Sequence, residues 1–162
     1  MIGILPGLDD LHQTRGGSKL QLARDLGADH VIDARTQDVV EETHKVGGAD
    51  VAIGLAVSNA SFQAAYGSLR RGGTLVLVAL PAEGKLELPV FETVLEGKRV
   101  IGSIVGTRED LAEVFHLHAL GRTRVIREQR ALDQVNESIA DILAGRVAAR
   151  IVFDFVGRRA EH

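Results

Sequence analysis

The chain has 162 residues, 45% of them hydrophobic, with a formal net charge of −3 and a pI near 6.1. It is long enough to bury one core, and its slightly acidic balance and 4% aromatic content argue against a nucleic-acid partner. The absence of cysteine excludes disulfides and thiolate metal sites, and no apolar run approaches the roughly 20 residues of a membrane span. We therefore expect a cytoplasmic globular protein with no membrane partner.

Helix and strand patterns alternate through the first two thirds of the sequence. Ser18 and Thr36 are predicted to cap helices, and glycines, among them the pair Gly72-Gly73, are predicted to end them. The β-branched runs between the helices are typical of parallel strands buried on both faces. This alternation predicts an α/β fold with a doubly wound, mostly parallel sheet and right-handed crossovers. The predicted helices span 18–26, 36–45, 59–69 and a segment ending near residue 97; the predicted strands span 30–33, 51–56, 74–80 and 99–105.

The pattern changes after Thr107. Thr107 and Asp110 are predicted to open a helix that Gly121 ends. A strand over 125–130, a helix over 132–143 and a strand over 150–155 follow. This part is expected to form a small α+β appendage. At the other end of the chain, residues 1–5 have the composition of a strand, but residues 6–17 break any period.

Two of the predicted strands end in segments that favour a nucleotide site. They are 78–81, with the sequence Val-Ala-Leu-Pro, and 103–107, with the sequence Ser-Ile-Val-Gly-Thr. In open α/β sheets, ligands bind just outside the carboxyl ends of the strands. Small side chains, a proline and exposed backbone amides at two such ends therefore predict a nucleotide pocket. No G-x-G-x-x-G motif follows an early strand, which makes a methyltransferase-like nucleotide binder the less favoured interpretation.

Several short segments in a fixed order carry a family resemblance. They are 19–32 (KLQLARDLGADHVI), 47–51 (GGADV), 68–76 (SLRRGGTLV), 103–108 (SIVGTR) and 145–152 (GRVAARIV). Each segment alone is a weak motif, but their common order and spacing are specific. From about residue 19 to residue 155 the chain resembles the C-terminal part of zinc-dependent medium-chain alcohol dehydrogenases, and most closely the bacterial enzymes that act on simple primary alcohols.

The resemblance implies a Rossmann-like fold that is truncated at its N-terminal end. In that family a zinc-containing catalytic domain precedes the cofactor-binding domain, and the chain then returns to the catalytic domain. The resemblance accordingly divides this chain into an irregular lead-in or remnant over 1–17, a partial Rossmann domain over 18–107, a segment returning to the catalytic domain over 108–155, and a tail over 156–162.

The resemblance also assigns residues to an NAD site. It places Ala56, Val57 and Ser58 beside the adenosine ribose, and Val78, Ala79 and Leu80 against the nicotinamide carboxamide. Ser103, Ile104 and Val105 are placed on the other side of the nicotinamide ring. Arg150 is assigned to the pyrophosphate. Zinc belongs to the intact family, and the resemblance assigns neither a metal ligand nor a catalytic residue to this chain.

Two hypotheses of different classes follow. The first is that the chain is a truncated NAD-binding portion of a zinc-dependent alcohol dehydrogenase. The intact family transfers hydride between a primary alcohol or aldehyde and the nicotinamide cofactor, and this chain alone is expected to be inactive. The second is a non-catalytic oligomerisation or interaction module, with a homodimer formed through the strand predicted at 99–105.

Other chemistry is weakly supported by the sequence. His116 and His118 are two residues apart on a predicted helix, so they point to different sides and do not chelate one metal together. Ser58 and Ser61 have no His and Asp partners in any hydrolase motif.

Overall fold

The computed structural model describes residues 11–14, 17–147 and 150–155. They form two compact units, one ending at Val105 and the other beginning at Gly106. The strand expected at residues 1–5, most of the lead-in and the tail over 156–162 lie outside the described residues.

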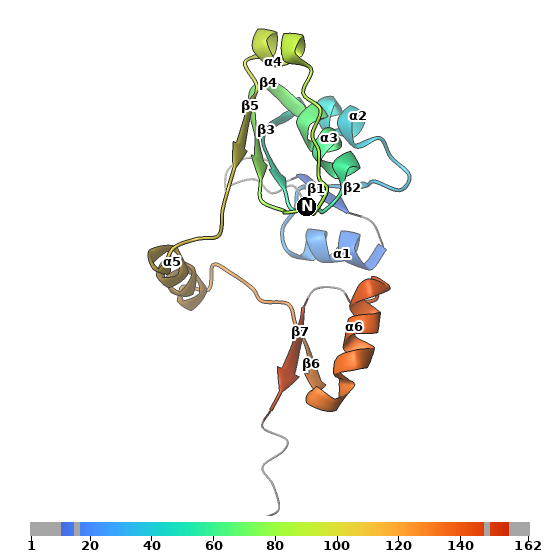
Figure 1. The fold of residues 1–162 in the computed structure, drawn as a ribbon, viewed down its shortest axis with the longest axis vertical. Helices are drawn as coiled ribbons and strands as arrows, with labels where there is room; N and C mark the ends of the chain where they lie inside the picture. Colours follow the sequence, from blue (N-terminus) through green and yellow to red (C-terminus); the bar gives the residue numbers. More distant parts are fainter. Residues whose placement is uncertain (1–10, 15–16, 148–149, 156–162) are drawn as a thin grey trace, which may run out of the picture. The chain divides into compact units, whose positions relative to one another are not determined.

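In the first unit, strands and helices alternate and every described strand pair is parallel (Figure 1). The elements are β1 (Leu11–Thr14), α1 (Gly17–Asp25), β2 (His30–Asp33), α2 (Val39–Lys45), β3 (Ala49–Gly54), α3 (Asn59–Gly67), β4 (Leu69–Leu77), α4 (Val90–Glu96) and β5 (Arg99–Gly102). The strands form one sheet of β1 and β2 and another in the order β3-β4-β5. Figure 1 shows α2 and α3 on one side of the three-stranded sheet. The α/β prediction is thus confirmed.

Strand β1 was not predicted. It lies within the stretch expected to be irregular, and its sequence, LHQT, has no apolar alternation that marks a strand. Its residues pair in parallel with those of β2, from Leu11 with His30 to Thr14 with Asp33. Tertiary pairing of this kind overrides local propensity, so the strand carries no local signal of its own.

The core of the first unit lies between α3 and the sheet. Ala52 of β3 and Leu75 of β4 are fully buried and cluster with Ala65 and Tyr66 of α3. The small side chain of Ala52 lets the helix approach the strands closely, and burial of a side chain such as Leu75 contributes about 2 kcal/mol. This packing fixes α3 against the sheet and so places the amino end of the helix beside the strand ends.

The pair Gly72-Gly73 does not end a helix, as predicted, but lies inside β4. Helix α3 ends at Gly67 instead. The register between β3 and β4 shifts between Ala49 and Val51, opposite the glycine pair. Gly72 has a φ of 75°, and a Cβ on Gly73 would lie 2.8 Å from the carbonyl oxygen of Ala49. The glycines are therefore required by a bulge in the sheet, which the sequence pattern does not distinguish from a helix stop.

All three strands of this sheet end before their predicted ends, and β3 and β4 also begin earlier than predicted. The predicted 51–56, 74–80 and 99–105 become Ala49–Gly54, Leu69–Leu77 and Arg99–Gly102. The amides of Val78 and Ala79 both donate to the carbonyl oxygen of Gly54, at 3.2 and 3.0 Å, so the chain turns off the ladder there. After β5, the Ser103 amide donates to the carbonyl of Leu77, the last residue of β4, at 2.9 Å. The segments predicted to bind the cofactor consequently lie on loops beyond the strand ends.

Two helix starts also differ from the prediction. Asp38, not Thr36, caps α2, because its side chain accepts a hydrogen bond from the Glu41 amide at 2.9 Å. Helix α1 begins at Gly17, so Ser18 lies in its first turn and not at the cap position. Asp and Thr are both favoured caps, and local sequence alone does not choose between two of them spaced two residues apart.

The second unit contains the predicted helices and two short strands. Thr107 and Asp110 form the predicted capping box at the start of α5 (Arg108–Ala119). Further along, Arg130 and Asp141 form an ion pair with N and O atoms 2.7 Å apart, which links β6 (Glu128–Ala131) to α6 (Val135–Leu143). The strand predicted at 125–130 begins later, at Glu128. The elements are α5 (Arg108–Ala119), β6 (Glu128–Ala131), a 3-10 turn (Leu132–Gln134), α6 (Val135–Leu143) and β7 (Ile151–Asp154), with β6 and β7 parallel.

Candidate functional site: an apolar pocket at the ends of β4 and β5

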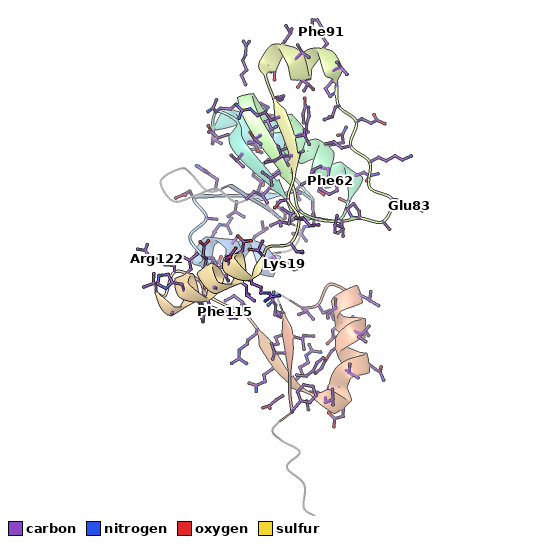
Figure 2. All side chains as sticks on the ribbon, turned by 60° about the vertical axis from the view of Figure 1, so that its left-hand side comes forward. Lys19, Phe62, Glu83, Phe91, Phe115 and Arg122 are labelled. Carbon is purple, nitrogen blue, oxygen red and sulfur yellow. The ribbon has the colours of Figure 1, made fainter. Side chains whose placement is uncertain are left out.

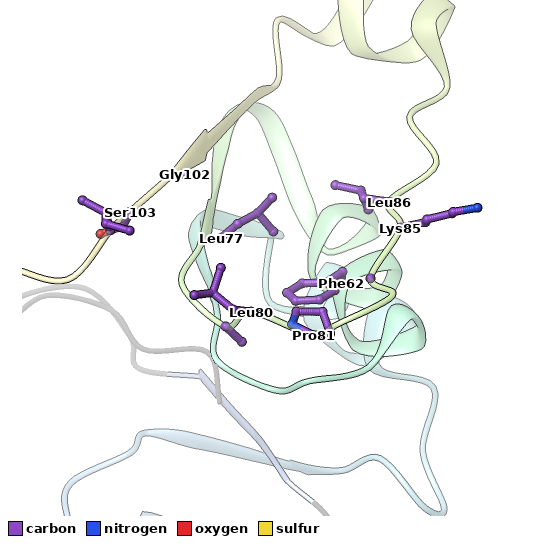
Figure 3. Close-up of a pocket in the computed structure, with 11 residues that line it drawn as sticks. Phe62, Leu77, Leu80, Pro81, Lys85, Leu86, Gly102 and Ser103 are labelled. Atoms are coloured by element: carbon purple, nitrogen blue, oxygen red, sulfur yellow. The ribbon is translucent and has the colours of Figure 1, made fainter.

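A pocket of about 490 Å³ opens at the carboxyl ends of β4 and β5 (Figure 3). Its walls come from α3, from the loop after β4 and from the residues that follow β5. Lys85 carries the one charge among the described residues that line it, and its side chain extends away from the ring of Phe62 in Figure 3. The lining residues are Phe62, Leu77, Ala79, Leu80, Pro81, Gly84, Lys85, Leu86, Gly102, Ser103 and Ile104. An apolar cavity of this size suits a flat ring better than a charged group.

Phe62 of α3, which is labelled in Figure 2, forms the wall of the pocket on the helix side. The residue is 4% exposed, and its ring packs over Gly54 at the end of β3, where an added Cβ would meet two ring atoms at 3.0 Å. The N-cap Ser58 accepts a hydrogen bond from the Ser61 amide at 3.2 Å and so fixes the first turn of α3. A strand that ends in glycine and a capped helix together place Phe62 at the pocket.

A tight turn closes the loop side of the pocket. The Gly84 amide donates to the Pro81 carbonyl at 3.3 Å. A Cβ on Gly84 would lie 2.2 Å from Cγ of Pro81, so the turn accepts glycine alone without rearrangement. Pro81 has no amide hydrogen, which agrees with the end of strand pairing before this turn.

A second cavity, of about 530 Å³, lies against the same turn. It is lined by Val57, Asn59, Leu80, Pro81, Ala82, Glu83 and Gly84. Leu80, Pro81 and Gly84 line both cavities, so this turn separates two hollows at the edge of the sheet.

The structure brings together part of the predicted cofactor set. Ala79, Leu80, Ser103 and Ile104 line the pocket, and Val57 lines the second cavity. These residues come from three loops that meet at one edge of the sheet, as the strand-end argument predicts.

Other predicted residues line neither cavity. Val78 and Val105 are 37% and 83% exposed. Ala56 and Ser58 support the start of α3, since the carbonyl oxygen of Ala56 accepts a hydrogen bond from Ser61 Oγ at 3.2 Å. The predicted roles of these residues in cofactor binding stay predictions.

Arg150 belongs to the second unit, directly before β7. Its side chain is exposed, and its carbonyl oxygen accepts a hydrogen bond from the Glu128 amide at 2.7 Å. Its predicted contact with a pyrophosphate stays a prediction.

The sequence interpretation missed Phe62, Gly84, Lys85 and Leu86. Gly54 is the signal that points to Phe62, because a glycine at a strand end marks a close approach of another group. Gly84, three residues after Pro81, marks the tight turn. Nothing in the local pattern distinguishes Leu86 from an ordinary loop residue.

Backbone donors are available at the pocket, whereas metal ligands are not. No described residue accepts a hydrogen bond from the amides of Leu80 or Ile104. Across the described ranges there is no group of three or more His, Asp or Glu side chains that could hold a metal ion. None of the helices in those ranges combines the length and apolar character that crossing a bilayer requires.

Comparisons with known proteins agree on one family. Residues 14–119 match the family model described as zinc-binding dehydrogenase. An alcohol dehydrogenase of Geobacillus stearothermophilus is 42% identical over 147 residues, which cover 90% of this chain and 43% of the relative. The chain thus spans about two fifths of the length of this relative.

Solved structures agree on the fold. The alcohol dehydrogenase of Aeropyrum pernix superposes with a TM-score of 0.80 at 32% identity, covering 88% of this chain and 42% of that one. The acetophenone reductase of Geotrichum candidum, solved in complex with NAD, gives 0.74 at 25% identity, covering 92% and 42%. The Rossmann-like expectation is confirmed, and the chain belongs to the zinc-binding dehydrogenase family.

Proposed function

We propose that this chain is the NAD-binding portion of an alcohol dehydrogenase and that the pocket at the ends of β4 and β5 takes the nicotinamide ring. The observation that carries the proposal is the position of an apolar pocket at two neighbouring strand ends, lined by Ala79, Leu80, Ser103 and Ile104. These are residues that the family resemblance assigns to the two sides of that ring. In this proposal residues 18–107 are the partial Rossmann domain, and residues 108–155 are the segment that returns to a catalytic domain.

The residues present fit a nicotinamide group. Phe62, Leu77 and Leu80 supply apolar walls, and the amides of Leu80 and Ile104 are donors for a carboxamide oxygen. When bound, NAD supplies the hydride acceptor. The chain's own residues bind the ring, orient it and exclude water from one of its faces. The cysteine-free composition also agrees with a reducing, cytoplasmic location.

The described residues do not fit a catalytic zinc ion. The chain has no cysteine, and its described part offers no cluster of three ligands. We derive no step through zinc and expect the purified chain to show no oxidation of ethanol with NAD. Measurable NADH production by the chain alone would contradict this expectation.

Calorimetric titration of NADH into the full chain tests the binding proposal. Leu80 is 84% exposed and lines both cavities, so Leu80→Asp places a carboxylate at the pocket without disturbing the core. We expect the Kd for NADH to rise at least about tenfold, because a charged group replaces an apolar contact with the ring. Leu143, 83% exposed on α6 and outside both cavities, gives the matched control Leu143→Asp, which leaves the Kd unchanged. Equal affinity in all three proteins would refute the proposal.

The second candidate function is an interaction module that forms a homodimer through β5. Among the described strands, β5 pairs only with β4, so its outer edge carries unpaired backbone groups. Ile101 in β5 is 49% exposed, and Ile104 and Val105, which follow the strand, are 80% and 83% exposed. Light scattering at high concentration is expected to give a dimer, and Ile101→Lys is expected to give a monomer. A strict monomer for the unmodified chain would count against this function.

A further inference from the structure

Side chains on one face of α3 form hydrogen bonds with a single segment, residues 85–93, which follows the turn at the pocket. Asn59, Gln63 and Tyr66 have the spacing i, i+4 and i+7, which places them on one side of the helix. Their partners occur in the same order along residues 85–93. Lys85 N donates to Asn59 Oδ1 at 3.1 Å, Gln63 Nε2 donates to the Glu87 carbonyl at 3.2 Å, and Tyr66 Oη lies 2.5 Å from Thr93 Oγ1.

We propose that Asn59, Gln63 and Tyr66 are positioning residues, which fix the segment 85–93 and through it one wall of the pocket. The inference rests on the proposed function in that the ligand positioned by this wall is taken to be the nicotinamide ring. None of the three side chains lines the pocket itself, and they act through Gly84, Lys85 and Leu86, which do.

The chemistry of each partner fixes the direction of each hydrogen bond. A backbone amide only donates, so Asn59 is the acceptor for Lys85. A carbonyl only accepts, so Gln63 is the donor to Glu87. The Thr93 hydroxyl donates to the Pro89 carbonyl at 2.8 Å, which leaves Tyr66 as the donor to Thr93.

The hydrogen bonds of Asn59 and Gln63 are the polar contacts that hold this wall of the pocket against α3. Within the described chain, residues 85–88 make no other hydrogen bond or ion pair that links them to the rest of the protein. The side chain of Leu86 lies between these two bonds in sequence, lines the pocket and packs against the core of α3 and the sheet. Loss of either bond therefore frees the backbone on one side of Leu86.

Because Asn59 accepts its hydrogen bond and Gln63 donates its own, replacing each amide by the matching carboxylate tests the two bonds separately. Asn59→Asp keeps an acceptor for the Lys85 amide, whereas Gln63→Glu removes the donor to Glu87 and leaves two acceptors facing each other. Both changes add the same charge at exposed positions of α3, so the comparison cancels a general effect of charge. Gln21→Glu is the control for the substitution itself, because Gln21 bonds only to Asp25 within α1 among the described side chains.

Three readouts on the full chain separate the possible outcomes. They are the amide exchange rates of residues 85–88, the methyl resonances of Leu86 without ligand, and the Kd for NADH. We expect Gln63→Glu and Asn59→Ala to speed amide exchange at residues 85–88 and to raise the Kd for NADH, each by at least about fivefold. Both variants are expected to shift the Leu86 methyl signals and to leave the urea midpoint of unfolding nearly unchanged. Asn59→Asp and Gln21→Glu are expected to resemble the unmodified protein in exchange and methyl signals, and Asn59→Asp to weaken NADH less than Gln63→Glu.

The inference is overturned if Asn59→Asp and Gln63→Glu change the exchange rates equally, or if NADH binds the unmodified chain and Gln63→Glu with the same Kd. Absence of NADH binding to the unmodified chain, with the expected exchange and methyl pattern, would instead refute the proposed ligand and support the positioning of the wall.

Discussion

The ammonium group of Lys98 lies 5.0 Å from the centroid of the Tyr66 ring. The Lys98 side chain is 3% exposed, and its Nζ atom lies 2.6 Å from Glu92 and 2.8 Å from Glu96. Burial lowers the pKa of this ammonium group, but the hydrogen bonds that it donates to Glu92 and Glu96 outweigh burial and raise the pKa overall. One buried cation thus joins both ends of α4 to the ring that α3 presents to the core.

Removal of this cation is expected to loosen α4. Lys98→Met keeps the apolar stem but loses both ion pairs and the contact with the ring, while Glu92 and Glu96 regain water. We expect a loss of about 1–2 kcal/mol in the free energy of unfolding, measured by urea denaturation. Lys45 on α2 gives a matched control, since it also pairs with two glutamates but is 55% exposed. A midpoint for Lys98→Met no lower than that for Lys45→Met would contradict the expectation.

The turn at the pocket provides a second test. A Cβ at Gly84 would lie 2.2 Å from Pro81 Cγ, so Gly84→Ala is expected to cost about 1–3 kcal/mol and to weaken NADH binding. Gly102 also lines the pocket, but no atom lies within 4 Å of a Cβ placed there. Gly102→Ala should therefore unfold at nearly the same urea concentration as the unmodified chain. Equal midpoints for the two variants would show that the turn is not tight.

The bulge in β4 predicts that alanine at its two adjacent glycines lowers the free energy of unfolding by different amounts. At Gly73 a Cβ would approach two carbonyl oxygens, of Ala49 at 2.8 Å and of Arg70 at 2.9 Å. At Gly72 nothing lies within 4 Å, and the cost comes from its φ of 75°. We expect Gly72→Ala to lose about 1 kcal/mol and Gly73→Ala to lose more, because backbone atoms do not move aside easily. Thermal unfolding of both variants measures the order, and a milder effect at Gly73 would contradict it.

The first unit also contains a pair that titrates in acid. Hydrogen bonds from the Arg35 side chain and amide lower the pKa of the Asp33 carboxyl from 3.8 to about 2. A lowered pKa in the folded state adds stability above pH 3.8, and that stability is lost as the pH falls from 3.8 towards 2. Arg35→Gln is expected to return the pKa of Asp33 towards 3.8, as followed by carboxyl NMR titration. Arg24→Gln on α1 is the control, and an unchanged Asp33 titration in Arg35→Gln would refute the assignment.

Much of the α/β order was predictable because its signals are local. Apolar patterns and the glycines that follow them identify α1, α2 and α4, the apolar pattern alone identifies α3, and the capping box at Thr107 identifies α5. The boundaries that failed depend on atoms far away in sequence. Val78 leaves the strand because its amide reaches the carbonyl of Gly54, and Gly72 forms a bulge because β3 pairs out of register there.

The pocket residues also divide into those that the sequence predicts and those whose position depends on distant contacts. Leu80 and Ile104 were predictable, since strand ends in parallel sheets collect at one edge. Phe62 and Leu86 were not, because their place in the pocket depends on how α3 packs and on how the loop crosses it. The hydrogen bonds that link Asn59 and Gln63 with this loop join residues 26 and 24 positions apart, and no local pattern encodes them.

The turn made by Leu80, Pro81 and Gly84 stands as a shared partition between two hollows of about 490 and 530 Å³. A change in this turn therefore alters the lining of both hollows together. Leu80→Asp and Gly84→Ala change the wall of the second hollow as well as that of the pocket, so a ligand of either hollow is expected to respond to the same two variants.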